Sequence, residues 1–142
     1  MIKNFLHFIT ESRIIIKKDD AGRSKSSWPT SKNDCSVRVT CLAFNLNYDE
    51  VYNYFKEIGP IRGGFSDSEI LLVWKKLGKS HEKIRPSKGM LLSDFLKKYP
   101  KGSYVLSYRN HVTNVIDGVL YEIDKPLEYF QKEIIHKIYK IR

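Results

Sequence analysis

The strongest constraint on the fold is a pair of alternating segments, HVTNVI (111–116) and VLYEI (119–123), joined by Asp117–Gly118. Apolar residues at every second position favour a strand with one face in a core. An Asp-Gly pair between two such runs is a strong signal for a two-residue hairpin, because it tolerates positive φ. A third alternating run, GSYVLSYR (102–109), precedes the pair. We therefore expect an antiparallel sheet over residues 102–123.

The preceding part of the chain has a helical period instead. Two neighbouring apolar stripes, one through Cys35 and one through Val37, predict a helix that begins at Cys35 and is buried on most sides. Further helices are predicted over residues 2–12, 48–58, 66–78, 90–100 and about 126–140. The Ser66–Glu69 spacing matches a capping box. Helices followed by an antiparallel sheet indicate the α+β fold class.

The length of 142 residues and the 42% of hydrophobic residues suit one domain with a real core. We expect a single domain over residues 1–142. Within it, residues 1–32 form an N-terminal extension and loop, residues 33–124 form the core, and residues 125–142 form a C-terminal helix.

Composition narrows the classes of function. The net charge of +9 allows contact with nucleic acid or with an acidic protein, but the basic residues are scattered. The longest apolar run, ILLVW (70–74), is far shorter than the roughly 20 residues that span a bilayer, so no membrane partner is expected. Two cysteines do not form a disulfide framework, which favours a soluble, cytoplasmic protein. Metal-ligand spacings and glycine-rich phosphate loops are missing, so no cofactor is expected.

Cys35 is a candidate nucleophile because a helix N-terminus favours the thiolate form of a cysteine. Cys41, two turns into the same helix, is interpreted as a core residue. A nucleophilic thiol needs a base, and His111 is the best placed histidine because it opens a strand, which is a rigid platform. The other histidines lie in predicted terminal helices or in a loop: His7, His136 and His81.

The hairpin register supplies a carboxylate for His111. With Asp117–Gly118 as the loop, His111 comes directly opposite Asp124, where cross-strand Cβ atoms lie about 4.5–5.5 Å apart. Glu122 shares that face one diagonal step away. Either carboxylate could orient His111 and stabilise its charged form, and this geometry ranks Asp124 first. Taken singly, a helix-start cysteine and a strand histidine are usually structural, so the hypothesis depends on their combination.

Two longer stretches, NDCSVRVTCLAFNLNYDEVYNYF and YPKGSYVLSYRNHVTNVIDGVLYEID, carry a family resemblance. They resemble the small papain-like cysteine peptidases of bacteriophage and bacterial genomes, and are more distantly similar to the peptidase domains that trim bacteriocin leaders. The resemblance covers roughly residues 33–124. It implies a papain-like fold, in which the nucleophile helix of an N-terminal helical half packs on a C-terminal antiparallel sheet.

The resemblance also implies the roles of individual residues. Cys35 is the nucleophile, His111 is the general base, and ungapped alignment puts the acid at Glu122 rather than Asp124. The oxyanion-donating glutamine of papain-like enzymes falls at Pro29, so Asn33 is the candidate donor instead. The implied reaction is hydrolysis of a peptide, isopeptide or side-chain amide, by a phage accessory protein acting on a host or phage protein in the host cytoplasm.

Two other functions stay open. An inactive papain-like module could grip a host protein, for example an acidic one, which agrees with the missing glutamine and the net charge of +9. A basic nucleic-acid-binding protein is the other alternative, and it predicts an affinity that falls steeply with salt. The scattered distribution of the basic residues makes this alternative the weakest of the three.

Overall fold

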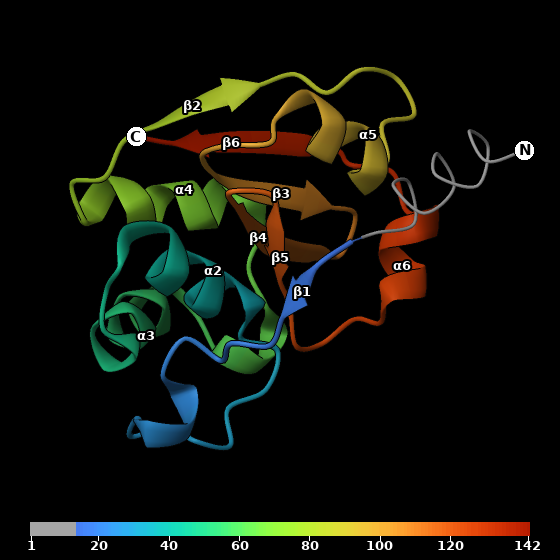
Figure 1. The fold of residues 1–142 in the computed structure, drawn as a ribbon. Coiled ribbons are helices and arrows are strands. Elements are labelled where there is room, and N and C mark those ends of the chain that lie inside the picture. Colours follow the sequence, from blue (N-terminus) through green and yellow to red (C-terminus); the bar gives the residue numbers. More distant parts are fainter. Residues whose placement is uncertain (1–13) are drawn as a thin grey trace, which may run out of the picture.

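A six-stranded sheet forms the centre of the structure, a computed structural model that describes residues 14–142 (Figure 1). The strand order is β1-β5-β4-β3-β6-β2. The strands are β1 (Ile16–Lys17), β2 (His81–Ile84), β3 (Ser103–Tyr108), β4 (His111–Ile116), β5 (Val119–Tyr121) and β6 (Lys137–Ile141). Every neighbouring pair is antiparallel except β1 with β5, which is parallel. Because helices are combined with a sheet that is antiparallel in all but one pair, the α+β class is confirmed.

The helices of the described residues mostly follow the predicted boundaries. They are α2 (Cys35–Phe44), α3 (Tyr48–Ile58), α4 (Asp67–Lys76), α5 (Leu92–Lys98) and α6 (Leu127–Lys132), with two short 3-10 helices, η1 (Arg23–Lys25) and η2 (Ile61–Gly63). The predicted capping box of α4 is present, since Ser66 and Glu69 each accept a hydrogen bond from the other's backbone N–H. The helix predicted over residues 2–12 lies outside the described residues. Over residues 14–142, every helix is too short or too polar to cross a bilayer.

The β4–β5 hairpin forms as predicted. Ile116 pairs with Val119, and the loop residues Asp117 and Gly118 have φ of 49° and 79°. Positive φ at both central positions is the requirement of a type I′ turn. Asp117 also accepts a hydrogen bond from the Gly102 N–H at 2.9 Å, which ties the turn to the start of β3. The hairpin is thus fixed both by its own loop and by the neighbouring strand.

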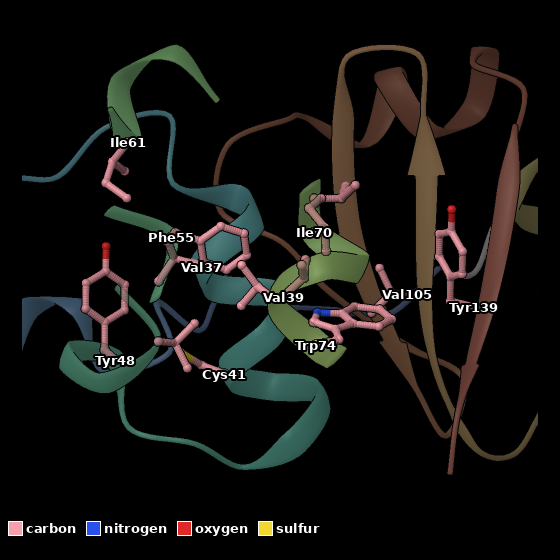
Figure 2. Packing of buried hydrophobic residues seen from close by; sticks show 13 residues of the cluster. Val37, Val39, Cys41, Tyr48, Phe55, Ile61, Ile70, Trp74, Val105 and Tyr139 are labelled. Carbon is pink, nitrogen blue, oxygen red and sulfur yellow. The ribbon is translucent and has the colours of Figure 1, made fainter. Parts of the chain in front are cut away.

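Both faces of the sheet are covered, so the core has two parts. On one face, the helices α2, α3 and α4 pack against Val105, Val112 and Tyr139 of the sheet (Figure 2). The other face packs against α5 and α6 through a second group of buried side chains: Leu92, Phe95, Tyr104, Leu106, Val115, Leu120, Phe130 and Ile138. Because both faces are covered, every residue of β3 after Ser103 is buried, including the polar Ser107.

The prediction of a C-terminal helix, over about 126–140 within residues 125–142, is wrong beyond Lys132. The chain leaves α6 and forms β6, which lies between β3 and β2 in the sheet. Ile138 and Tyr139 are both buried, one on each face of the sheet, so the segment lacks the alternation of a half-buried strand. Without that alternation, the pattern also fits a helical stripe. Pairing with β3 resolves the ambiguity, because it satisfies backbone groups that would otherwise lie unpaired at a buried edge.

The helix α2 is anchored directly on β4. Asn114 of β4 donates a hydrogen bond from Nδ2 to the Val39 carbonyl oxygen at 3.0 Å, and both groups are buried. Trp74 of α4 donates from Nε1 to Thr40 Oγ1 at 2.9 Å. These polar contacts fix the rotation and height of α2 over the sheet. As a result, the N-terminus of α2 meets the beginning of β4, which brings Cys35 and His111 together.

Candidate functional site

The site begins with Cys35, which is the first residue of α2 and is half-buried. The preceding residue, Asp34, occupies the N-cap position, but its carboxylate does not cap the helix. It accepts hydrogen bonds from Arg38 Nε at 3.0 Å, Arg23 Nη1 at 3.0 Å and the Tyr48 hydroxyl at 2.7 Å. The first N–H groups of α2 therefore lack the side-chain cap that usually satisfies them. These N–H groups add positive potential beside the Cys35 thiol.

His111 stands at the first position of β4 and is only 5% exposed. Its Nε2 lies 2.7 Å from Glu122 Oε1, and Glu122 is only 3% exposed. The other carboxylate oxygen of Glu122 accepts the backbone N–H groups of Asp124 and Lys125, each at 2.8 Å. Glu122 is therefore held on both oxygens, and it fixes the orientation of the imidazole. With Nε2 engaged, Nδ1 is the nitrogen left to contact the thiol of Cys35.

The prediction that Asp124 lies opposite His111 is wrong. The β5 ladder ends at Tyr121, so the chain turns away before position 124 reaches the register that would face His111. Asp124 instead forms an ion pair with Arg38 Nη2. Glu122, the alternative from the sequence, is the residue that contacts His111. The glutamate side chain is longer than that of an aspartate and reaches His111 across the diagonal step. The backbone N–H groups of Asp124 and Lys125, in the turn that follows, donate to its other carboxylate oxygen.

The three groups stabilise one another's charged forms. Burial raises the pKa of the Cys35 thiol, but the hydrogen bond and charge of His111 outweigh it, so the pKa lies below its ordinary value. Burial lowers the pKa of His111, yet its contacts with Cys35 and Glu122 raise it to about 9. Burial also raises the pKa of Glu122, and the His111 contact brings it below the ordinary range. These directions favour the charged thiolate and imidazolium over the neutral thiol and imidazole.

Cys41 differs in all of these respects, as the sequence predicts. It is 3% exposed and belongs to the core on the α2 face of the sheet (Figure 2). Burial raises the pKa of its thiol to about 12, and the charge of Asp34 adds to the effect. Cys41 is therefore a protonated core residue at neutral pH, and it provides an internal reference for the reactivity of Cys35.

Asn33 lies next to the site, but its amide is already engaged. Its Nδ2 donates a hydrogen bond to the Arg62 carbonyl oxygen at 2.7 Å, and its backbone has a positive φ of 59°. This contact links the segment before α2 to η2. The amide has a second N–H, so its predicted role as an oxyanion donor stays a prediction.

Cys35 and His111 both line a cleft of about 710 Å³. Its lining also includes Gly63, Gly64 and Phe65 of the segment between α3 and α4. The other histidines are placed differently: His81 lies in β2 against Trp74, His136 lines the same cleft just before β6, and His7 lies outside the described residues. His81 and His136 were predicted in a loop and a helix, and both of these predictions are wrong. The cleft makes the thiol reachable from solvent.

A cation could be held only by displacing existing contacts. Among the described residues, His111, Glu122 and Asp124 place ligand atoms within 4.8 Å of one another. Their atoms are already committed, because His111 pairs with Glu122 and Asp124 pairs with Arg38. The guanidinium of Arg38 also adds positive charge beside the group, which opposes a cation.

Two supporting features were missed in the sequence. The Asp34–Arg38–Asp124 chain of ion pairs joins the start of α2 to the segment after β5, and the i,i+4 spacing of its first two members could have indicated it. The rings of Tyr129 and Phe130 from α6 lie 5.9 and 6.3 Å from the His111 ring. They cover the imidazole from the other face of the sheet, which no local sequence signal predicts.

Comparison with family models, curated proteins and solved structures gave no match.

Proposed function

We propose that this protein is a papain-like cysteine hydrolase that cleaves an amide bond through a thioester intermediate. The observation that carries the proposal is the chain of contacts from Cys35 through His111 to Glu122, at a helix N-terminus and open to a cleft. A nucleophile, a base and a group that orients the base are the elements of acyl transfer by such enzymes. The packing of α2 on β4 agrees with a papain-like arrangement.

In the first half of the reaction, the Cys35 thiolate bonds to the substrate carbonyl carbon, and the electron pair of the C=O bond moves to oxygen. The N–H groups at the start of α2 and the Asn33 amide stabilise that oxyanion. The C–N bond then breaks as the imidazolium of His111 gives its proton to the leaving nitrogen. The products of this half are a free amine, a Cys35 thioester and a neutral His111.

In the second half, neutral His111 takes a proton from water, and the hydroxide oxygen bonds to the thioester carbon. The C–S bond breaks, the acid is released, and the Cys35 thiolate and the His111 imidazolium are restored. Glu122 stays ionised throughout and holds the ring in place, which is the role of the third residue in such triads. The substrate bond is a peptide, isopeptide or side-chain amide, and a phage accessory protein acting in host cytoplasm is the biological setting that we propose.

The test is alkylation of the folded protein with iodoacetamide at pH 7, followed by peptide mapping. An ordinary thiol is only a few per cent ionised at this pH, whereas a paired thiolate is mostly ionised. We expect Cys35 to react at least about a hundredfold faster than Cys41, which is buried and has a raised pKa. In urea, both cysteines are expected to react at similar rates. Equal rates in the folded protein would contradict the proposal.

His111→Ala provides the matched variant for this test. The variant is expected to lower the Cys35 rate at pH 7 while leaving Cys41 unchanged, because only Cys35 contacts the imidazole. Hydrolysis is then measured on pooled fluorogenic peptides with wild type and Cys35→Ala. Retention of any hydrolysis by Cys35→Ala would exclude Cys35 as its nucleophile.

A second candidate function is an inactive module that grips another protein. It is favoured by the engagement of the Asn33 amide with Arg62 and by Pro29 at the position of the family's glutamine. This function predicts that Cys35→Ala keeps full binding of the partner, and that the wild type releases no product from any peptide pool.

A further inference from the structure

A second hollow of about 690 Å³ adjoins the cleft that contains Cys35, and the proposed mechanism does not use it. It lies between the segment 27–32, one face of α3 and the segment 60–62. We name it the Trp28 groove, after the ring on its wall. Lys32 and Arg62 line the groove, and the residues that follow them, Asn33 and Gly63, line the cleft. The hydrogen bond from Asn33 to the Arg62 carbonyl closes the wall at that junction.

The charge of the Trp28 groove has one sign. Its charged lining residues are Lys32, Lys56 and Arg62, and its lining includes no carboxylate. All three side chains are exposed, and none forms an ion pair with another residue of 14–142. By contrast, the lining of the cleft includes Asp67 and Glu69. The groove thus concentrates unpaired positive charge beside a more balanced cleft.

The aromatic wall of the groove is already paired. The rings of Trp28 and Tyr52 are stacked at 4.5 Å with an interplanar angle of 12°. The ammonium group of Lys56 lies 4.9 Å from the Trp28 ring centre. The Trp28 ring therefore holds the Lys56 ammonium group in position through a cation–π contact. This pairing disfavours nucleic acid, because single-stranded bases bind by stacking on free aromatic faces.

We propose that the Trp28 groove binds an acidic stretch of the same polypeptide whose amide bond enters the cleft. This inference rests on the proposed function for the idea of a polypeptide substrate. Three observations support it: the groove and the cleft share a wall, the groove is uniformly basic, and its aromatic ring is engaged by its own neighbours. Carboxylates of the ligand pair with Lys32 and Arg62 at the end nearest Cys35, and with Lys56 further along.

The first experiment measures binding without the nucleophile. Cys35→Ala protein is titrated into fluorescein-labelled Glu₁₂ and Gln₁₂ peptides and a dT₁₂ oligonucleotide, and anisotropy is followed at several salt concentrations. We expect Glu₁₂ to bind more tightly than both of the others. The double variant Lys32→Glu/Arg62→Glu is expected to weaken Glu₁₂ binding about tenfold, because it replaces two exposed ion pairs with contacts between like charges.

Lys101→Glu/Lys88→Glu is the matched control. Both lysines are exposed and lie outside the groove, and their replacement changes the net charge by the same amount as the groove variant does. It is expected to change the affinity for Glu₁₂ less than twofold. An equal loss in the control pair would mean that only net charge matters and would overturn the proposal. Tighter binding of dT₁₂ than of Glu₁₂ would also overturn it, in favour of a nucleic-acid surface.

The second experiment tests whether groove and cleft act together. Glu₁₂ and Gln₁₂ peptides carrying a chloroacetyl group at either end are reacted with wild-type protein. We expect the Glu₁₂ probe, in at least one orientation, to alkylate Cys35 at a concentration about tenfold lower than the Gln₁₂ probe requires. The Lys32→Glu/Arg62→Glu variant is expected to remove this difference between the two probes. If iodoacetamide modifies Cys35 rapidly but no Glu₁₂ probe has an advantage, the groove proposal fails and the hydrolase proposal stands. If Glu₁₂ binds the groove but Cys35 is unreactive, the groove stands and the hydrolase proposal fails.

Discussion

Replacing Glu122 with glutamine tests which carboxylate supports His111. The side chain keeps its size, but it loses its charge and the ability of its second oxygen to accept the N–H groups of Asp124 and Lys125. The pKa of His111 is raised to about 9 from an ordinary value of 6.5. A shift of that size corresponds to about 3 kcal/mol in favour of the charged ring. Cys35 and Glu122 are the two partners that produce it.

If Glu122 provides about half of that energy, its loss lowers the pKa of His111 by about one unit. The thiolate–imidazolium pair then becomes about tenfold less favourable relative to its neutral form. We therefore expect the rate constant for alkylation of Cys35 at pH 6.5 to fall about tenfold in Glu122→Gln. Its rise with pH is expected to shift towards the ordinary thiol range, because the imidazolium that lowers the pKa of Cys35 is less populated.

The assay is the second-order rate constant of iodoacetamide with Cys35 between pH 5 and 9, with the His111 ring protons followed by NMR. Asp124→Asn is the matched control, since it removes a neighbouring carboxylate that contacts Arg38 instead of His111. We expect this variant to change the rate less than about twofold. An effect of Asp124→Asn as large as that of Glu122→Gln would refute the reasoning, as would an unchanged pH profile in Glu122→Gln.

Three further predictions concern stability and are measured by urea unfolding. Asp34→Asn is expected to cost about 3–5 kcal/mol, because it removes the more deeply buried of the two carboxylates that pair with buried Arg38, and a loss below 1 kcal/mol would contradict this. Ile138→Ala is expected to cost about 2–5 kcal/mol and Ile134→Ala less than about 1, since only Ile138 is fully buried; similar losses would disprove the strand. Gly118→Ala is expected to cost about 1–2 kcal/mol because of its positive φ, and an unchanged stability would exclude the turn.

The features that sequence alone determined depend on residues close together in the chain. The start of α2 at Cys35, the capping box of Ser66 and the Asp117–Gly118 turn are all as predicted. The capping box and the turn are set by the preferences of a few neighbouring residues, and the start of α2 is predicted from the spacing of its apolar residues, since Asp34 does not cap this helix. The pairing of Cys35 with His111 followed from two such features, a helix start and a strand start.

The features that only the tertiary structure decided depend on contacts between distant segments. Residues 137–141 form a strand because β3 offers an unpaired edge between two covered faces, and no local pattern contains that edge. Glu122 contacts His111 because the β5 ladder stops at Tyr121, while the carboxylate of Asp124 forms an ion pair with Arg38. Burial determines these pairings, because a charged or polar group that is removed from water needs a partner. Which partners are available depends on the packing of the whole chain.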